Sequence, residues 1–442
     1  MPVSVAIVGA GPSGFYTAEA LIKKGLDCRI DIIECLPTPY GLIRYGVAPD
    51  HQTTKRVWRA YEKTALREPV SFYGNVEVGR DIPLDALRRM YDAVVVAVGS
   101  PLDRPLNIPG ADKAGVFGSA EFVGWYNGHP DFRDLNPKFD CQAAAVIGNG
   151  NVALDVARVL VKTPQEMAES DLTDYAAAAI HNAPLTDVYL FGRRGPVQAK
   201  WTNVELREMG KLQNAAPILD PAQLPEAVTG EMPDRERRLK EKNLNTLTSF
   251  LEVSPEGKTK RLHFAFYASP VEVLGDARVE GLRLERTRLE GGRAVGTGET
   301  FDVACGLIVA SIGYRMRTLT DLPLDAERGI VENRDGRVAE GLYVVGWAKR
   351  GPTGVIGSNK PDANQAAKQI AEDFPEGGKP GRAALEAWLD EHDLRAVDFE
   401  EWKRIEAAET EAAPSGAPRK KIVRVADMLA VLDRATEESA TG

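Results

Sequence analysis

Three short apolar runs of this chain lead directly into glycine-rich loops. Val3–Val8, Ala143–Ile147 and residues 342–345 have the length of strands, and their mostly apolar composition is typical of strands buried in a parallel sheet. Each of the first two runs continues through a glycine loop into a helical pattern and then into another apolar run. The pattern therefore predicts two βαβ units, as in doubly wound α/β proteins.

The first glycine loop has the spacing G-x-G-x-x-G between a predicted strand and a predicted helix. Gly9 permits the tight turn, Gly11 lets the backbone approach a pyrophosphate, and Gly14 allows the helix to pack closely on the strand. Glu34 ends the next predicted strand, where a carboxylate accepts hydrogen bonds from ribose hydroxyls. These residues predict a dinucleotide site.

The second glycine loop runs from Gly148 to Ala153, with alanine in the third glycine position, which the fingerprint tolerates. The strand that follows is not closed by an acid but by Arg193 and Arg194. A carboxylate would repel a 2′-phosphate, whereas guanidinium groups bind it through charge-assisted hydrogen bonds. The loop therefore predicts an NADP(H) site, with an insertion over about residues 163–184 lengthening the crossover. The alternative is a solvated arginine pair after a structural strand.

A third glycine-rich segment, residues 346–357, follows a predicted strand and precedes a predicted helix. Such a segment can bring backbone N–H groups to the distal part of FAD. Two dinucleotide loops of different kind in one chain predict FAD and NADP(H), with hydride passing from nicotinamide to flavin.

The remaining apolar patterns predict further elements. Helices are predicted over residues 15–24, 53–66, 152–161, 233–242 and 363–374. Strands are predicted over residues 29–34, 70–78, 93–98, 187–191, 263–267, 279–286 and 307–312. Residues 37–51 are rich in proline and glycine and are expected to be irregular, although they are apolar. The chain after Glu406 is expected to be a loosely packed extension.

Composition and charge narrow the functional classes. The chain has 442 residues and a net charge of −9, which argues against general nucleic-acid binding. Its apolar runs fall short of the roughly 18 residues of a membrane span. The N-terminus lacks a cationic signal-peptide region, so we expect a cytoplasmic protein without membrane insertion.

The isolated Cys28, Cys35, Cys141 and Cys305 form no C-x-x-C pair and no zinc spacing. Neither a redox-active disulfide nor a bound metal is therefore expected.

Six segments carry a wider resemblance. They are G-A-G-P-S-G, L-P-T-P-Y-G-L-I-R-Y-G-V-A-P-D-H, G-N-G-N-V-A-L-D-V-A-R, F-G-R-R-G, E-L-R-E and G-W-A-K-R-G-P-T-G-V-I-G. Over roughly residues 3–370 the chain resembles the adrenodoxin-reductase family of ferredoxin–NADP reductases. The resemblance implies two doubly wound, Rossmann-like α/β domains, with an NADP domain (105–317) inserted into a discontinuous FAD domain (1–104 and 318–442, the latter with a C-terminal extension).

The resemblance also implies which positions contact each cofactor. Beside the loop glycines, those implied for FAD are Ser13, Glu34, Leu42, Val78, Trp347, Gly354, Val355 and Ile356. Those implied for NADP(H) are Gly150, Asn151, Val152, Ala153, Arg193, Arg194 and Glu205, with Gly354 touching both nucleotides. Those implied near the reacting rings are His51, Asp155 and Glu208. The residues themselves leave other roles open, namely structural hydrogen bonding for His51 and capping or orienting its helix for Asp155.

The implied activity is that of an NADPH:ferredoxin oxidoreductase. Because the chain has no cluster ligands, the one-electron partner has to be a separate iron–sulfur protein, a ferredoxin. The same architecture serves disulfide reductases, against which the missing cysteine pair argues, and the electron-input subunit of glutamate-synthase-like complexes, against which the missing N-terminal cluster cysteines argue. A diaphorase with another acceptor and a FAD/NADPH redox sensor without turnover are further alternatives.

A cluster of basic residues suggests where an acidic ferredoxin docks. The predicted helix over residues 233–242 carries five cations, Arg235, Arg237, Arg238, Lys240 and Lys242. Because the chain is acidic overall, productive encounter with an acidic partner needs a local positive surface. Helical spacing places Arg235, Arg238 and Lys242 on one face. The alternative is a solvated helix whose cations are balanced by neighbouring glutamates.

Overall fold

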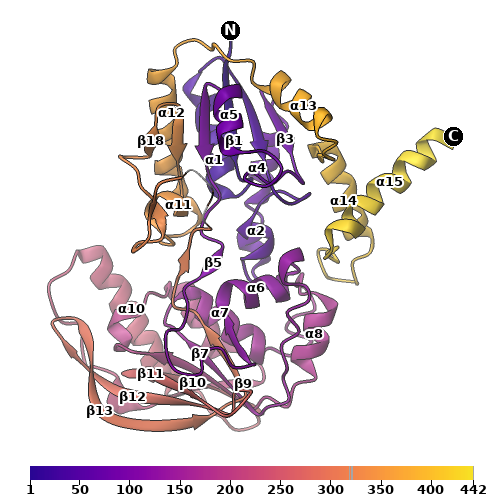
Figure 1. Cartoon of the computed structure of the whole chain (residues 1–442). Helices are drawn as coiled ribbons and strands as arrows, with labels where there is room; N and C mark the ends of the chain where they lie inside the picture. Colours follow the sequence, from indigo (N-terminus) through magenta and orange to yellow (C-terminus); the bar gives the residue numbers. More distant parts are fainter. Residues whose placement is uncertain (318, 320–321, 442) are drawn as a thin grey trace. The chain divides into compact units, whose positions relative to one another are not determined.

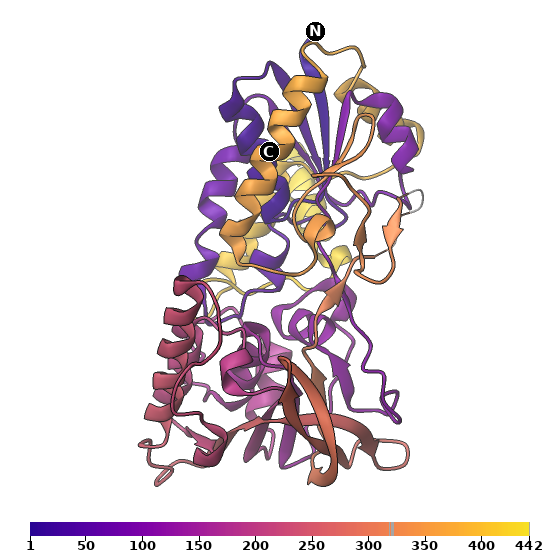
Figure 2. The same ribbon diagram turned by 90° about the vertical axis from the view of Figure 1, so that its left-hand side faces the viewer.

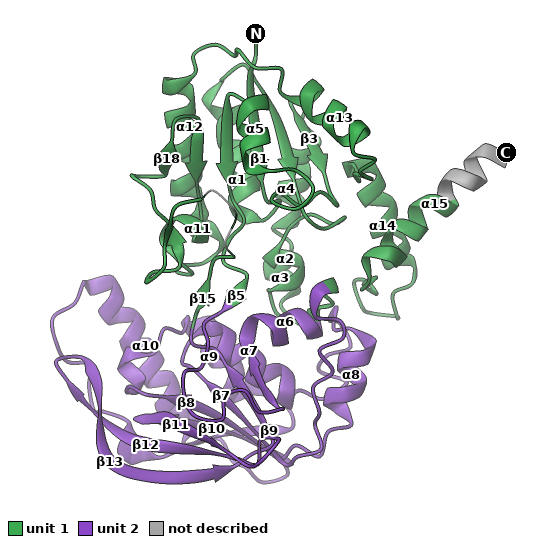
Figure 3. Ribbon diagram, viewed as in Figure 1, with its two compact units in different colours: residues 1–102, 127–130, 313–442 green, residues 103–126, 131–312 purple. Residues whose placement is uncertain are grey.

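The computed structural model describes residues 1–317, 319 and 322–441, with side chains described up to residue 434. The chain divides into two compact units (Figures 1 and 3). Unit 1 comprises residues 1–102, 127–130 and 313–442, and unit 2 comprises residues 103–126 and 131–312. Unit 2 is thus an insertion into unit 1. The boundary expected at 104/105 lies close to the first division, and residue 318, where the second was expected, lies outside the described residues.

Unit 1 is built on a sheet of six strands. In spatial order they are β18 (Arg337–Ala339), β19 (Leu342–Val344), β4 (Ala93–Val96), β1 (Val3–Val8), β2 (Cys28–Ile33) and β3 (Val70–Tyr73). Neighbouring strands are parallel except at the edge, where β18 is antiparallel to β19. All residues of β1 and β4 are buried, which requires helices on both faces of the sheet.

The helices of unit 1 connect these strands. They are α1 (Pro12–Lys24), α2 (Leu42–Tyr45), α3 (Gln52–Lys55), α4 (Trp58–Ala65), α5 (Leu84–Met90), α11 (Trp347–Arg350), α12 (Asn359–Asp373), α13 (Arg382–Glu391), α14 (Phe399–Glu411) and α15 (Val425–Thr441). α12 packs along α1 (Figure 2). Gly25 ends α1 with φ 75°, the left-handed C-cap that its position after Lys24 predicts.

Unit 2 also has a six-stranded sheet, and all of its neighbouring strands are parallel. In spatial order the strands are β6 (Val116–Gly118), β14 (Leu307–Ala310), β7 (Ala143–Ile147), β8 (Asp187–Gly192), β10 (Lys260–Phe266) and β9 (Ala215–Leu219). A separate antiparallel sheet contains β11 (Ala268–Leu274), β12 (Gly281–Glu290) and β13 (Arg293–Ala304). Its last two strands meet at a turn formed by Gly291 and Gly292, both of which have positive φ.

The helices that begin in unit 2 are α6 (Ser119–Asn127), α7 (Asn151–Val161), α8 (Asp174–His181), α9 (Asn203–Glu208) and α10 (Asp234–Phe250). The predicted insertion in the crossover contains α8. α10 continues well beyond the predicted end at residue 242, because Leu244, Leu247 and Phe250 bury one apolar side of the helix.

Three predictions of local structure in unit 1 are wrong. The strand expected over residues 70–78 ends at Tyr73, because Gly74 pairs instead with Val397. The helix expected over residues 53–66 is broken between α3 and α4, where the N–H of Val57 reaches Thr54 in a tighter turn. The irregular segment over residues 37–51 contains the helical turn α2.

The expected loose packing of the chain after Glu406 is also wrong. Glu409 and Met428 are fully buried, and Leu432 is nearly so. The segment is rich in Ala and Glu overall, but α15 still has an apolar face. Met428 and Leu432 stand four residues apart on that face and belong to the core of unit 1.

Candidate functional site

The loop between β1 and α1 has the geometry that a pyrophosphate-binding loop requires. Gly9 has φ +110°, and a Cβ there would lie 2.7 Å from the carbonyl oxygen of Ala97. A Cβ on Gly14 would lie 2.1 Å from the carbonyl oxygen of Gly9, so α1 can begin this close to β1 only with glycine. A Cβ on Gly11 would meet no described atom within 4 Å. The accessible backbone at the first turn of α1 fits a phosphate.

Glu34 follows β2 and turns toward this loop. Its Oε2 accepts a hydrogen bond of 2.8 Å from the N–H of Ala10, and its Oε1 accepts from the N–H of Leu36 at 3.4 Å. Burial raises the pKa of Glu34 above its usual value, and these N–H donors oppose the shift. The structure thus places a carboxylate beside the first glycine loop, as the dinucleotide fingerprint requires.

Residues 40–46 lie directly against the first glycine loop. The N–H of Tyr40 donates to the carbonyl oxygen of Ala10 at 2.8 Å, and a Cβ on Gly41 would lie 3.0 Å from the Cα of Gly11. Leu42 begins α2 and leaves 45% of its surface exposed. An exposed leucine beside the phosphate loop offers an apolar contact to a flavin ring.

The segment after β19 reaches the beginning of α1. Gly346 has φ +67°, and a Cβ there would lie 2.7 Å from the Cβ of Ser13. Ser13 is buried and donates to the carbonyl oxygen of Ala97 at 3.3 Å. Trp347 begins α11 and stacks on Tyr314, with ring centroids 5.9 Å apart. The first and third glycine segments, far apart in the sequence, therefore form one site in unit 1.

Three further predicted FAD residues lie between α11 and α12. Gly354 has φ +86°, Val355 is 61% exposed, and Ile356 begins a short 3-10 turn before α12. Val78 differs from them, because its side chain is buried in the core of unit 1. Val78 pairs with Ile82 in an isolated β-bridge, which fixes the backbone of Val78 after the end of β3.

The second glycine loop repeats the geometry of the first in unit 2. Gly148 has φ +138°, and a Cβ there would lie 2.2 Å from the carbonyl oxygen of Ser311. Gly150 is the N-cap of α7, and a Cβ on it would meet no described atom within 4 Å. This loop therefore also fits a pyrophosphate at a helix N-terminus.

The first turn of α7 is held in place from its side. The Oδ1 of Asn151 accepts a hydrogen bond of 2.9 Å from the N–H of Thr202, which precedes α9. Val152 is half-buried and Ala153 is fully buried. These residues set the position of α7 and α9 relative to the loop.

Arg193 and Arg194 follow β8, which is the parallel neighbour of β7, so they lie at the same sheet edge as the second glycine loop. The hydroxyl of Thr287 donates to the carbonyl oxygen of Arg193 at 2.7 Å and fixes this turn. Arg193 is exposed and Arg194 half-buried, and neither guanidinium forms an ion pair with the part of the chain that the structure describes. Both cations can therefore bind a 2′-phosphate.

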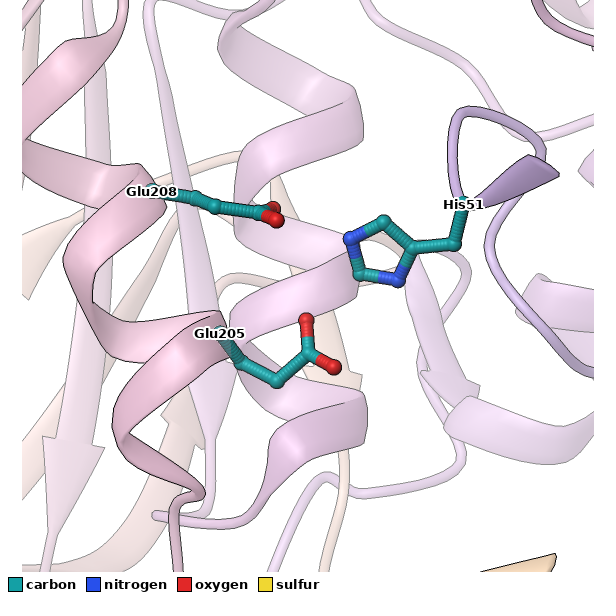
Figure 4. Close-up of side chains that lie close together, drawn as sticks. All are labelled: His51, Glu205 and Glu208. Atoms are coloured by element: carbon teal, nitrogen blue, oxygen red, sulfur yellow. The ribbon is translucent and has the colours of Figure 1, made fainter. Parts of the chain in front are cut away.

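Three acidic residues of unit 2 share one buried guanidinium. Asp155 lies on α7, while Glu205 and Glu208 lie on α9 and project their carboxylates to the same side of that helix (Figure 4). Arg158 is fully buried, and its Nη1 lies 2.8 Å from the Oδ1 of Asp155 and 4.0 Å from the Oε2 of Glu205. Its Nε lies 3.5 Å from the Oε2 of Glu208. Arg158 thus sets where all three carboxylates point.

Arg158 was not predicted from the sequence, although a signal for it exists. Asp155 and Arg158 are the charged residues of the otherwise mostly apolar α7, and they stand three residues apart. A buried arginine requires a partner, and this spacing supplies one. His51 belongs to unit 1, where it precedes α3 and its carbonyl oxygen accepts from the N–H of Lys55 at 3.1 Å.

The fold and the two glycine loops define a class of flavoprotein. Residues 3–177 match the model of the pyridine nucleotide-disulphide oxidoreductase family. Within this class the match to particular proteins extends over nearly the whole chain. It is 41% identical over 451 residues to human NADPH:adrenodoxin oxidoreductase, covering 97% of this chain and 91% of that protein.

A bacterial relative is similar to the same degree. NADPH-ferredoxin reductase FprA of Mycobacterium tuberculosis is 40% identical over 455 residues, covering 97% of this chain and 99% of FprA. The structure of FprA in complex with NADPH matches with a TM-score of 0.93 at 38% identity, over 98% of this chain and 99% of that chain. The chain belongs to this family of NADPH-dependent adrenodoxin and ferredoxin reductases.

Membership of the family confirms several predictions. The resemblance, the fold class, an FAD-dependent oxidoreductase activity, the cofactors FAD and NADP(H), and an iron–sulfur partner are all those of the family. The accessible loop glycines, the carboxylate at the first loop and the cations at the second fit these two cofactors in this chain.

Proposed function

We propose that this protein is an NADPH:ferredoxin oxidoreductase, which takes hydride from NADPH and delivers single electrons to an iron–sulfur protein. The observation that carries the proposal is the opposite charge beside its two glycine loops. Glu34 adjoins the first loop, whereas Arg193 and Arg194 adjoin the second. A carboxylate suits the free ribose hydroxyls of FAD, and two cations suit the 2′-phosphate of NADPH.

Unit 1 holds FAD in this proposal. The backbone of Gly9, Gly11 and Gly14 faces the pyrophosphate, and Glu34 binds the ribose. Further contacts come from Ser13, Leu42, Val78, Trp347, Gly354, Val355 and Ile356. When bound, FAD accepts the two electrons of a hydride together and releases them singly, which is the chemistry that links NADPH to a one-electron carrier.

Unit 2 holds NADPH. The N-terminus of α7 receives the pyrophosphate, with contacts from Gly150, Asn151, Val152 and Ala153. Arg193 and Arg194 bind the 2′-phosphate, and Glu205 on α9 completes the site.

His51, Asp155 and Glu208 orient the reacting groups. Hydride transfer needs no protein acid; it needs the donor carbon and the acceptor nitrogen held roughly 3–3.5 Å apart. Carboxylates can accept hydrogen bonds from the nicotinamide carboxamide. They also favour the positive charge that the nicotinamide ring gains as hydride leaves. Arg158 holds Asp155 and Glu208 for this task.

We propose a cytoplasmic location from the similarity to the bacterial ferredoxin reductase FprA, which extends over 97% of this chain and 99% of FprA. Among the helices that the structure describes, none combines the length and the apolar character that crossing a membrane requires.

The test is electron flow from NADPH to a panel of purified ferredoxins, with ferricyanide as the artificial acceptor. We expect steady reduction of both acceptors and a strong preference for NADPH over NADH. Ferricyanide reduction without reduction of any ferredoxin would favour the diaphorase alternative. Flavin reduction by NADPH without turnover on either acceptor would favour the redox sensor.

A further inference from the structure

The C-terminal part of unit 1 packs against the segment that carries α2. α14 begins with a capping box, in which Asp398 accepts from the N–H of Glu401 at 2.8 Å and Glu401 accepts from the N–H of Asp398 at 3.0 Å. The buried face of α14 carries Trp402, Ile405 and the carboxylate of Glu409, all fully buried. A carboxylate on this face requires a partner.

That partner is Arg44 of α2. Its two terminal nitrogens donate to the two carboxylate oxygens of Glu409, with Nη1 2.9 Å from Oε2. The side chain of Arg44 is 3% exposed and that of Glu409 is fully buried. The guanidinium carbon also lies 5.2 Å from the ring centroid of Trp402. Burial lowers the pKa of Arg44 and the carboxylate of Glu409 raises it, with a net rise, so the guanidinium stays charged.

The chain after α14 closes over the same pair. The N–H of Ile422 donates to Glu409 at 2.8 Å, and Arg419 approaches Glu409 at 3.5 Å. The Nζ of Lys421 donates to the carbonyl oxygen of Arg44 at 3.2 Å. Residues 398–422 therefore hold both the side chain and the backbone of Arg44.

The other side of the same segment faces the FAD site. Gly41 lies against Gly11 of the first glycine loop, and Leu42 presents exposed apolar surface beside it. Arg44 is two residues from Leu42 on the single helical turn α2. A shift of Arg44 therefore moves Leu42.

We propose that residues 398–422 act as a clamp on α2, with Glu409 as the positioning residue that keeps Leu42 in place to retain FAD. The clamp rests on the FAD site proposed for unit 1. If Glu409 loses its charge, Arg44 becomes a buried cation with a weakened partner, and α2 must move for the guanidinium to reach water. Leu42 then moves with α2 and no longer covers the flavin site.

The test compares Glu409→Gln with Glu411→Gln in the full-length holoprotein. Both variants make the same chemical change on α14, but Glu411 is exposed. The rate of FAD release is read from free-flavin fluorescence after dilution, and hydrogen–deuterium exchange is read at the amides of residues 42–47. We expect Glu409→Gln to release FAD at least tenfold faster and to exchange these amides faster, with Glu411→Gln unchanged.

A third variant separates the clamp from general loss of stability. Leu385 on α13 is fully buried in a different core cluster of unit 1, so Leu385→Ala weakens the fold without touching α2. Unchanged FAD release and exchange in Glu409→Gln would overturn the clamp, and so would equally fast release in Leu385→Ala.

Two further measurements keep the test decisive. If Glu409→Gln does not fold, Arg419→Gln replaces it, because the guanidinium of Arg419 is 17% exposed. Release accelerated threefold or more would support the clamp, and an unchanged rate would overturn it. Should the wild-type chain take up no FAD, the proposed cofactor site fails, while amide exchange at residues 42–47 still reports on the clamp.

Discussion

At the scale of single residues, Gly11 and Gly14 of the first loop differ in what a methyl group would meet. A Cβ on Gly11 enters open space, whereas one on Gly14 clashes with the backbone of Gly9. Gly11→Ala should therefore leave the Tm of the apoprotein unchanged and weaken FAD binding at least tenfold, or about 1.4 kcal/mol. Gly14→Ala should lower the apoprotein Tm as well. Thermal unfolding with and without FAD measures both effects, and equal FAD affinity in Gly11→Ala would disprove the proposed contact.

Arg193 and Arg194 should determine the choice of nicotinamide cofactor. A hydrogen bond to a charged group contributes about 1.5–3 kcal/mol. Replacing both arginines by alanine should therefore lower kcat/KM for NADPH on the order of a hundredfold while leaving that for NADH nearly unchanged. Arg293→Ala, at an exposed turn of unit 2, is the control. Equal losses with both cofactors would show that the pair supports the fold.

Asp103 should make the stability of unit 2 depend on pH. Its carboxylate accepts from the N–H of Ala120 at 2.8 Å at the start of α6, and burial raises its pKa to about 6. The raised pKa means that the folded state binds the proton more tightly than the unfolded state does. The contribution of this group to the free energy of unfolding is therefore present near pH 4 and is lost as the pH rises through 6. The loss is at most about 3 kcal/mol. Asp103→Asn does not titrate, so its Tm minus the wild-type Tm should rise between pH 4 and 7. A constant difference would contradict the assignment.

The site residues that can be predicted from the sequence belong to local patterns. The glycine spacing and the Arg193–Arg194 pair each lie within a few consecutive residues, so their chemistry can be inferred without knowing the fold. Arg44 could not be predicted, because its partner Glu409 is supplied by the fold and no spacing rule links residues that stand so far apart. Arg158 has a local signal in its spacing to Asp155, whereas its contact with Glu208 also depends on the fold.

At the scale of elements, the cations of α10 differ in whether they are available to the acidic partner that the sequence analysis expects there. Arg237 is occupied by the carbonyl oxygens of residues 228 and 230, and Lys240 pairs with Glu236. Arg235 and Arg238 are exposed and form no ion pair with the residues described in the structure. Reversing both to Glu should slow ferredoxin reduction at least tenfold at low salt while ferricyanide reduction continues. The wild-type rate should fall with salt, because screening shortens the reach of these charges to about 8 Å at physiological ionic strength.

The matched control reverses Arg288 and Arg293 to Glu. This variant changes the net charge of unit 2 equally but on β12 and β13. Equal slowing in both variants would mean that net charge, rather than the face of α10, sets the encounter rate.

The predicted elements were most accurate where local pattern alone decides. The apolar runs of β1 and β7 were predicted to the residue, because a glycine loop ends each of them. The ends of β3 and α10 were misplaced, since Val397 and an apolar helix face, both tertiary features, determine where they stop. The packing of α14 was missed for the same reason.

At the scale of the whole molecule, the two units have separate cores and should respond separately to ligand. Adenosine 2′,5′-bisphosphate carries the 2′-phosphate but no nicotinamide. At a hundred times its Kd it should stabilise unit 2 by about 2.7 kcal/mol. Hydrogen exchange should slow in β8 and α7 but not in β2 and β3. The Arg193→Ala/Arg194→Ala variant should lose this protection, and equal protection of both units would contradict separate binding.

The insertion of unit 2 also governs how the chain folds as it leaves the ribosome. β4 and β19 are neighbours in the sheet of unit 1. About 245 residues separate them, which translation at roughly 5–20 residues per second takes on the order of ten to fifty seconds to cover. During that interval the edge of β4 that later pairs with β19 has no partner strand. Unpaired edges of apolar strands tend to pair with other chains. The nascent protein is therefore most prone to aggregate while its middle is being made, and chaperone protection matters most at that stage.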